Sequence, residues 1–376
     1  MRVLFTTLPG SGFLLPMVPL AWALRSAGHE VLVAANGEMA AASAQAGLPT
    51  VDVRPDIDLW RDFMAYIRRE DGPPRGFGWF TEQTVESTVE LAGNFGPDAV
   101  VTVPEQGAGG IVAGLLGIPW VEHGIRLASC PAHSHIPAAH RQRELDQLAS
   151  IRARLGAPET PSSAAIDVRP PSLGGTEDDG CWSMKYLPYN GSRVLPDWVY
   201  ARPSRPRVCV SLGTVAPEMD GIGWLTGLVA ALSKMDIEVV LALGDRDISA
   251  LGPLAPNVRT LGYLPLSAVL PTCSAIVHHG GAATTATPLV HGVPQFVIPG
   301  GADNPLNARL VREAGVAITC GRDEIIPSLL CDGMKRLLTE SEFAERAAAL
   351  RAEIAAQPGP PDIVRRLEQL VLEGKK

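Results

Sequence analysis

The chain has 376 residues, of which 46% are hydrophobic and 19% are charged, with a formal net charge of -8 at pH 7. This length exceeds what one ordinary core needs and predicts two domains of about 150 to 200 residues each. The apolar content excludes a largely disordered protein. The acidic balance excludes nucleic acid and anionic membranes as main partners.

The N-terminus predicts a buried strand and not a secretion signal. Its apolar run follows Arg2, ends at Pro9-Gly10 and is too short for a signal-peptide core. No stretch approaches the ~20 consecutive apolar residues of a membrane-spanning helix, so we expect a cytoplasmic protein. The 6 cysteines show no CxxC spacing and no clustering with His, which favours reduced, mostly buried thiols over a metal site or disulfides.

The first residues predict the opening unit of a doubly wound α/β domain. Residues 2–7 have the pattern of a buried strand, Pro16 to Arg25 that of a helix, and residues 31–35 that of a second strand. Further strands are expected at 50–53, 98–103 and 118–122, with helices at 81–93 and 108–116.

Residues 124–206 lose this rhythm. They contain a helical stretch at 140–154 and a polar, proline-rich run that extends to residue 172. The run PDWVYARPSRPR at 196–207 is typical of a domain boundary.

The α/β rhythm restarts at residue 207. Strands are expected at 207–213, 237–243, 257–261, 275–279, 295–298 and 316–319, helices at 222–234, 266–272, 281–291 and 304–313, and amphipathic C-terminal helices at 340–356 and 360–373. Two α/β halves in one chain predict a binding cleft between them. We expect domains at 1–195 and 207–358, a linker at 196–206 and a helix at 359–376 that returns toward the N-terminal domain.

The strongest local signal is AIVHHGGAATTAT at residues 275–287. An apolar strand ends at His279 and passes through Gly280 and Gly281 into a helix, so glycine backbone, free N–H groups and the helix dipole would face a diphosphate, with Thr284 supplying a hydroxyl. The alternative is a plain strand–helix turn. His278 lies on the opposite side of the strand and is expected to be a packed histidine.

Three further strand ends carry polar or aromatic groups. Asp303 and Asn304 suit bonding to sugar hydroxyls, although both are also favoured helix caps. Gly213 and Thr214 would approach the phosphates or the base, which is a weak signal alone. Tyr263, followed by Leu264, could stack on a nucleobase or belong to the core.

These elements in this order resemble the antibiotic-tailoring glycosyltransferases of actinomycetes, of the calicheamicin and polyketide-pathway type. The resemblance covers nearly the whole chain and is most specific at HHGGAATTAT and at residues 1–31. It implies the GT-B fold, an α/β architecture with two Rossmann-like domains, a central cleft and C-terminal helices that pack back across the domains. The C-terminal domain holds the donor, and residues 124–206 supply acceptor-side helices.

The resemblance also implies the reaction. Such enzymes transfer deoxysugars from dTDP-sugars to polyketide, enediyne or macrolide aglycones, with inversion and without metal or cofactor. His279, Gly281 and Thr284 would hold the diphosphate, Asp303 and Asn304 the sugar, and Tyr263 with Leu264 the thymine. Plant relatives that use ribose donors have glutamate where this chain has Thr287, which favours dTDP over UDP. Asp245-Arg246-Asp247 matches a DxD metal motif only by pattern and is expected to be a solvated turn.

One departure concerns the general base. The resembling enzymes have G-H-x-x-P in the first loop, whereas this chain has Phe13, and a phenyl ring cannot accept a proton. Another residue could replace the base, and the candidates are His123, Glu105 and the group His133, His135 and His140. Alternatively, the acceptor is an activated aromatic carbon or a phenol, or the chain is an auxiliary homologue that binds a sugar nucleotide without catalysis.

An aromatic-rich segment predicts the acceptor site. Rings that could line a pocket for a flat, apolar acceptor are those of Phe13, Trp60, Phe63, Tyr66, Phe77, Trp79 and Phe80, although core packing is an equal alternative. A UDP-sugar epimerase would share the two-domain form but requires paired carboxylates near the phosphate site. We expect a dTDP-sugar and a small aglycone as partners, and the sequence leaves a homodimer open.

Overall fold

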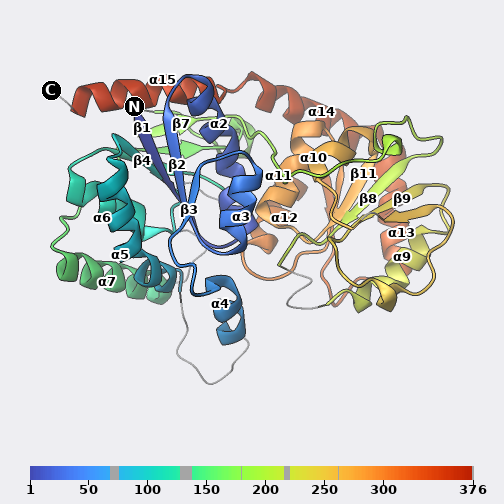
Figure 1. Ribbon diagram of the computed structural model, residues 1–376. Coiled ribbons are helices and arrows are strands. Elements are labelled where there is room, and N and C mark those ends of the chain that lie inside the picture. The colour runs from blue at the N-terminus through green and yellow to red at the C-terminus, as the bar shows by residue number, and fades with distance from the viewer. Residues whose placement is uncertain (68–75, 128–137, 179, 216–220, 261, 375–376) are drawn as a thin grey trace. The chain divides into compact units, whose positions relative to one another are not determined.

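The computed structural model describes residues 1–376 except 68–75, 128–137, 179, 216–220, 261 and 375–376. The chain divides into two compact units, each with its own parallel sheet (Figure 1). The first unit comprises Met1–Arg169, Gly175–Lys185 and Gln357–Lys376, and the second comprises Pro170–Gly174 and Tyr186–Ala356. Residues 186–195, which we assigned to the N-terminal domain from the sequence, therefore pack with the second unit.

The first unit contains a 7-stranded parallel sheet in the order β3-β2-β1-β4-β5-β6-β7. Its strands are β1 Arg2–Thr6, β2 Glu30–Ala35, β3 Thr50–Asp52, β4 Ala99–Thr102, β5 Trp120–His123, β6 Ala164–Asp167 and β7 Cys181–Ser183. The central strands are buried on both faces, which explains their continuous apolar runs. The strand order reverses between β1 and β4, so the loops at their carboxyl ends diverge and leave room for a ligand.

Helices flank this sheet. They are α1 Ser11–Leu14, α2 Val18–Ser26, α3 Glu38–Gln45, α4 Leu59–Ile67, α5 Gly78–Phe95, α6 Gly107–Leu116, α7 Ala138–Leu155 and α15 Pro360–Gly374. Left-handed glycines end two of them, since Gly96 follows α5 with φ 62° and Gly117 follows α6 with φ 64°. Helix α15 packs on α2, and Glu368 of α15 lies 2.9 Å from Nε2 of His29.

Strands β6 and β7 correct the interpretation of residues 124–206 as irregular. Both are short, at 4 and 3 residues, and β7 forms one edge of the sheet. Such short segments do not complete enough of the two-residue period to be recognised. Helices α3, α4 and α13 were not assigned from the sequence either.

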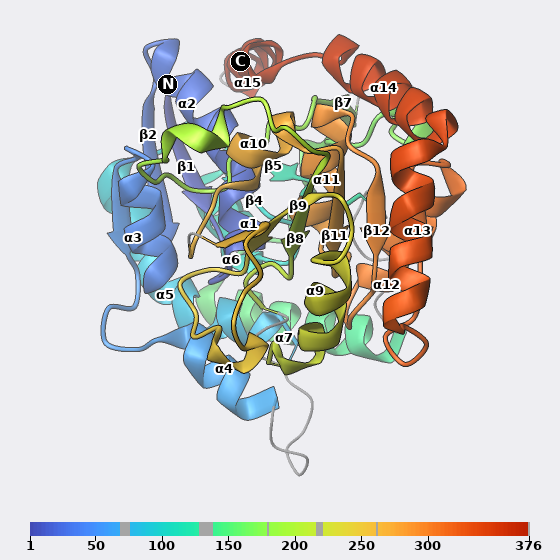
Figure 2. The same cartoon turned by 90° about the vertical axis from the view of Figure 1, so that its right-hand side faces the viewer.

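The second unit contains a 6-stranded parallel sheet in the order β10-β9-β8-β11-β12-β13. Its strands are β8 Arg207–Ser211, β9 Glu238–Ala242, β10 Val258–Thr260, β11 Ala275–His278, β12 Gln295–Val297 and β13 Ala317–Thr319. Its helices are α9 Thr226–Leu232, α10 Leu266–Val269, α11 Ala282–His291, α12 Asn304–Glu313, α13 Pro327–Thr339 and α14 Ser341–Ala356 (Figure 2). Short 3-10 helices lie at Leu15–Met17, Pro171–Leu173, Asp197–Val199, Gly223–Leu225, Ser249–Leu251 and Leu270–Thr272.

The core of the second unit fixes where its loops emerge. Apolar residues of β8, β9, β11 and β12 pack with those of α9 and α13 in one cluster, and Gly333 of α13 approaches the ring of Phe296 closely. Ser211 of β8 pairs in register with His278 of β11. The loops that follow these two strands therefore begin side by side at the carboxyl edge of the sheet.

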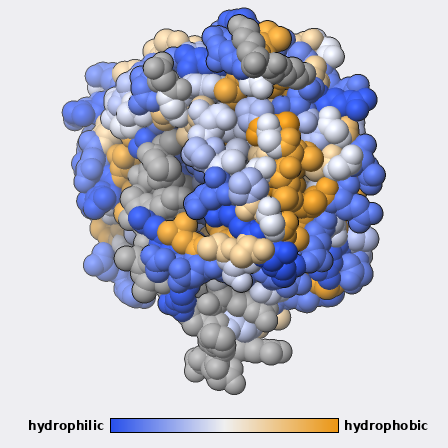
Figure 3. Space-filling model, turned by 90° about the vertical axis from the view of Figure 1, so that its left-hand side faces the viewer, coloured by the Kyte–Doolittle hydropathy of each residue, from blue (hydrophilic) through white to orange (hydrophobic). Residues whose placement is uncertain are grey.

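Apolar surface is limited on the face shown in Figure 3. Hydrophilic residues predominate there, and apolar side chains gather in narrow strips between them. In the described part of the chain, no helix is both long enough and apolar enough to span a bilayer.

Candidate active site

The loop after β11 holds the imidazole of His279 between two glycines. A Cβ atom at Gly213 would lie 2.6 Å from Cε1 of this ring, and a Cβ atom at Gly281 would lie 2.5 Å from its Nε2. Real Cβ atoms do not approach so closely, so any side chain at either position would displace the ring. The two glycines, from adjacent loops, therefore fix the orientation of His279.

The environment of His279 keeps its imidazole neutral. The residue is 9% exposed, and its buried Nδ1 makes no hydrogen bond of normal geometry to a described residue. Burial lowers the pKa of His279 to about 4, opposed by the backbone of Ser211 and the charge of Asp303. A neutral imidazole carries one N–H group and can donate it to a bound anion.

His278 is a packed histidine, as its position on the other side of β11 predicts. Its Nδ1 accepts a hydrogen bond from the N–H of Gly280 at 3.1 Å, so Nε2 carries the proton and donates to Oε1 of Gln295 at 2.7 Å. Burial, with a smaller contribution from His279, lowers the pKa of His278 to about 3. Both nitrogens serve the fold and neither is available to a ligand.

The first turn of α11 has the features of an anion site. Gly281 is the N-cap residue and provides no side-chain cap. The hydroxyl of Thr285 bonds back to the carbonyl of Gly281 at 2.9 Å, and that of Thr287 bonds back to Ala283 at 2.7 Å. The hydroxyl of Thr284, by contrast, makes no hydrogen bond to a described residue. Uncapped N–H groups at the positive end of the helix dipole, beside an uncommitted hydroxyl, favour a phosphate.

The loop between β12 and α12 lies against this turn. Asp303 occupies the N-cap position of α12, but its side chain makes no capping hydrogen bond. Ala302 has φ 56° and is the one non-glycine residue with positive φ in the described part of the chain. Backbone in this sparsely populated region marks a loop whose shape is imposed by its surroundings.

Asn307 joins the two loops and was not identified from the sequence. Its Nδ2 donates to the carbonyl of Gly280 at 2.9 Å and to Oδ2 of Asp303 at 3.3 Å. The residue is fully buried, and its Oδ1 has no partner in the described structure. One amide thus ties the glycine turn to the carboxylate that we assigned to the sugar.

The thymine candidates occupy different environments. The hydroxyl of Tyr263 donates to the carbonyl of Asn190, and its ring lies against Gly191. Leu264 is 5% exposed and belongs to a core cluster, so its side chain is packed and offers little surface to a base. Thr214 is exposed, and its carbonyl accepts from Nη2 of Arg246 at 2.7 Å.

The Asp245-Arg246-Asp247 run is a turn with structural hydrogen bonds. Asp245 accepts from Arg193 at 2.8 Å and from the N–H of Tyr263 at 3.0 Å, and Asp247 accepts from Ser249. Within the described residues, no three metal-ligating side chains come together. The described cysteines are free thiols, at Cys181, Cys209, Cys273, Cys320 and Cys331.

In the first unit, six of the seven aromatic side chains predicted to line an acceptor pocket form one cluster through ring contacts, and these are Phe13, Trp60, Phe63, Phe77, Trp79 and Phe80. The ring centroids of Phe13 and Phe77 are 5.5 Å apart, edge to face, and those of Phe63 and Phe80 are 4.8 Å apart. Further ring contacts join Phe63 to Trp60, Phe77 and Trp79. Phe80 is fully buried, whereas its neighbours in the cluster remain partly exposed. The cluster therefore has one buried ring, that of Phe80, and accessible surface on the rings around it.

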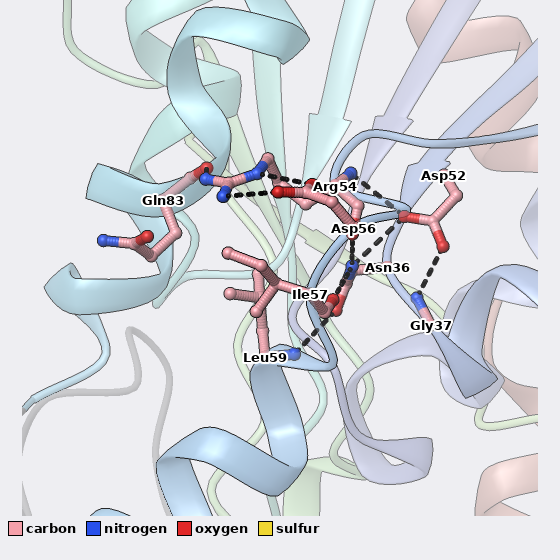
Figure 4. A network of polar contacts seen from close by, with 8 residues as sticks. All are labelled: Asn36, Gly37, Asp52, Arg54, Asp56, Ile57, Leu59 and Gln83. Atoms are coloured by element: carbon pink, nitrogen blue, oxygen red, sulfur yellow. Dashed lines mark hydrogen bonds and ion pairs between the residues drawn. The ribbon is translucent and has the colours of Figure 1, made fainter.

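Asn36 is the centre of a hydrogen-bond network at the start of α4, the helix that carries two of these rings (Figure 4). Nδ2 of Asn36, directly after β2, donates to Oδ1 of Asp52 at 3.1 Å and to the carbonyls of Arg54 and Ile57 at 2.7 and 3.0 Å. Its Oδ1 accepts from the N–H of Leu59 at 3.1 Å, at the first residue of α4. The helix that carries Trp60 and Phe63 is thereby fixed to the ends of β2 and β3.

The structure engages the two candidate bases in other contacts. Glu105 forms an ion pair with Arg126, and its side chain is 1% exposed. His123 is fully buried, and its Nδ1 lies 2.9 Å from the carbonyl of Gly124. Burial lowers the pKa of His123 to about 4. His133, His135 and the side chain of His140 lie outside the described residues.

Comparison with known proteins identifies the family. Residues 22–73 and 74–213 match the N-terminal domain, and residues 226–370 the C-terminal domain, of "Erythromycin biosynthesis protein CIII-like" proteins. The chain belongs to this family. It is therefore a glycosyltransferase, and its two α/β units have the GT-B architecture. It is 37% identical to the elloramycin glycosyltransferase ElmGT of Streptomyces olivaceus, over 98% of this chain and 97% of the relative.

Solved glycosyltransferase structures support this membership. The crystal structure of SnogD from Streptomyces nogalater superposes with a TM-score of 0.84 and 35% identity, covering 99% of both chains. SsfS6 from Streptomyces sp. SF2575, complexed with thymidine diphosphate, superposes with a TM-score of 0.79 and 35% identity, covering 98% of this chain and 99% of that chain. The family resemblance inferred from the HHGGAATTAT motif is confirmed.

The sequence predicted more of the candidate site residues in the second unit than in the first unit. His279, Gly213, Gly280, Gly281 and Asp303 come together in the second unit, as their strand-end positions predicted. Glu122 was missed because a single carboxylate inside an apolar strand suggests an edge position and not a site. Burial, with a contribution from Glu105, raises the pKa of Glu122 to about 7.

Proposed function

We propose that the chain is an inverting glycosyltransferase that transfers a deoxysugar from a dTDP-sugar to a small, apolar natural-product aglycone, without a metal. The observation that carries this proposal is the His279 ring, fixed by Gly213 and Gly281 at the uncapped start of α11. The thymidine diphosphate bound to SsfS6 supports the choice of donor class.

The second unit would act on the leaving group. As the anomeric carbon reacts through an oxocarbenium-like state, negative charge grows on the departing diphosphate. The N–H groups of the first turn of α11, the hydroxyl of Thr284 and the N–H of His279 would stabilise that charge from fixed positions. Asp303 and Asn304 would hold the sugar. A single displacement by the acceptor inverts the anomeric configuration.

The surroundings of Thr287 support dTDP over a ribonucleotide. Its hydroxyl bonds to the carbonyl of Ala283 and to the buried Tyr186, so it offers no free group to a ribose 2′-hydroxyl. A 2′-deoxyribose requires no partner at that point. We therefore expect dTDP to bind more tightly than UDP.

The first unit would bind the aglycone. Partly exposed rings of Phe13, Trp60, Phe63, Phe77 and Trp79 supply apolar area for a flat molecule. The presence of Phe13 at the usual base position favours a second candidate, transfer to an activated aromatic carbon, in which the attacking atom requires little deprotonation.

Calorimetric binding of dTDP tests the donor site. Replacing His279 with Ala should weaken the affinity about 10- to 150-fold, because a hydrogen bond to a charged group contributes roughly 1.5–3 kcal/mol. His291→Ala, in the last turn of the same helix, is the matched control and should bind dTDP as the parent does. Unchanged affinity in His279→Ala would contradict the proposed site.

A further inference from the structure

Glu122 lies at the carboxyl end of β5. It is partly exposed, and it pairs in register with Thr102 of β4 and Ala165 of β6. Among the described residues it accepts no hydrogen bond and forms no ion pair. A mostly buried carboxyl without structural bonds is unusual, because burial of such a group is costly unless it is paired. The fold therefore does not explain this residue.

A second carboxylate lies beside it. One oxygen of Glu105 is bonded to Arg126, whereas Oε2 is buried without a partner. The negative charge of Glu105 acts on Glu122. Burial and this repulsion raise the pKa of Glu122 to about 7. Glu122 thus gains and loses its proton near neutral pH.

The carboxyl pair is connected to the aromatic cluster. Gln106, next to Glu105, donates from Nε2 to the carbonyl of Thr7 at 3.2 Å, in the loop that leads to Phe13. Its Oε1 accepts from the hydroxyl of Thr81 at 3.2 Å, and Thr81 directly follows Phe80 of the cluster. The loop of Glu105, the charged neighbour of Glu122, is therefore bonded to the elements that carry the rings.

We propose that Glu122 is the general base that accepts the proton of the acceptor hydroxyl. This inference rests on the proposed glycosyl transfer. The acceptor oxygen forms its bond to the anomeric carbon, the bond from that carbon to the diphosphate oxygen breaks, and the hydroxyl proton passes to the Glu122 carboxylate. The dTDP leaves with the electron pair of the broken bond, and Glu122 then releases the proton to solvent through its exposed edge.

The alternatives in the same region are closed to solvent. Glu105 is ion-paired with Arg126, and its side chain is 1% exposed. His123 points to the opposite face of the sheet from Glu122 and is fully buried. A base is most effective when it is accessible and its pKa lies near the working pH, and Glu122 meets both conditions. Glu122 would thereby take the function that Phe13 cannot perform.

Titration of the carboxyl groups tests this without any substrate. In protein labelled with ¹³C at the glutamate carboxyl, one signal should titrate near neutral pH and disappear in Glu122→Gln. Among the described residues, the charge that acts on Glu122 is that of Glu105, which is paired with Arg126, whereas His123 lies on the other face of the sheet; Glu105→Gln should therefore shift this titration to lower pH. Titration of Glu122 in the ordinary range, near about 4.3, would overturn the proposal.

Transfer from dTDP-glucose to phenols of graded acidity tests the catalytic step. With 2-naphthol, Glu122→Gln should lower kcat about 10²- to 10⁴-fold and leave the KM for dTDP-glucose unchanged. The loss should shrink with 4-nitrophenol, which is already largely ionised at pH 8 and requires no base. Glu122→Asp should recover part of the rate, and Glu90→Gln, an exposed glutamate on α5, is the matched control.

The outcomes separate this inference from the proposed function. An equal loss of rate with both phenols would indicate a structural effect and would overturn the assignment of Glu122. If neither phenol is glycosylated, the titration decides. If the parent protein binds neither dTDP nor dTDP-glucose in calorimetry, the glycosyltransferase mechanism proposed above fails, whatever the titration shows.

Discussion

The carboxyl edges of the two sheets are built in different ways. In the second unit, glycines and backbone groups leave almost no freedom: His279 is confined by Gly213 and Gly281, and Asn307 joins two loops. In the first unit, rings from α1, α4 and α5 contact one another, and the start of α4 is held by hydrogen bonds to Asn36. A diphosphate requires donors at fixed positions, whereas an apolar molecule requires area and shape, so the two edges suit different ligands.

The largest effect should come from filling the space beside His279. Gly281→Ala would place a Cβ atom 2.5 Å from Nε2 of the ring and force it out of position. We expect dTDP binding to fall below detection in calorimetry. Gly223→Ala is the matched control, because nothing lies within 4 Å of its added Cβ atom. Normal dTDP affinity in Gly281→Ala would mean that the confined ring is a packing feature.

Replacing Asn307 distinguishes an effect on donor binding from an effect on stability alone. Asn307→Ala leaves the carbonyl of Gly280 and the carboxylate of Asp303 without their shared donor, and should weaken dTDP-glucose binding about 5- to 20-fold. Asn257→Ala is the control, because the Asn257 amide also donates to two backbone carbonyls, at 3.1 and 2.9 Å, away from these loops. Both variants should lose stability in thermal unfolding. If both also bind the donor normally, Asn307 serves only the fold.

The smallest effect on donor affinity should follow a change on the acceptor side. Phe13→His removes one edge-to-face ring contact, worth about 0.5–1.5 kcal/mol, and adds a titratable group. We expect dTDP affinity within about twofold of the parent and a changed rate of transfer, measured by product formation with dTDP-glucose and 2-naphthol. Loss of dTDP binding would show that the first loop does not belong to the acceptor side.

Much of the candidate donor site was predictable because its signals are local. A strand end, two glycines and a helix start are contiguous in AIVHHGGAATTAT, and parallel strands bring their ends to one edge. Asn307 and Glu122 were missed because their significance depends on contacts made only in the folded chain. Asn307 lies within an ordinary helical pattern, and the pKa of Glu122 depends first on its burial and then on Glu105, which belongs to the loop after another strand, β4.

The acceptor region was predictable as a set of rings but not as an arrangement. Composition indicated an aromatic segment, whereas the contact between Phe13 and Phe77 joins residues far apart in the chain. Strands β6 and β7 were too short to recognise, so the sheet that supports this region was underestimated. Local pattern therefore pointed to the candidate anion site, whereas the arrangement of the rings depends on tertiary packing.

The position of α15 affects how this protein can be made. Residues Gln357–Lys376 belong to the first unit, where Glu368 contacts His29 and Nε2 of Gln357 donates to the carbonyl of Arg169 at 2.8 Å and to the hydroxyl of Ser183 at 3.0 Å. During translation, all seven strands of the first sheet are synthesised before the second unit. Helix α15, which completes the first unit, is synthesised only after the second unit. Until then, the surface of α2 that α15 contacts is uncovered. A gene fragment that ends near residue 185 would encode the first unit without α15.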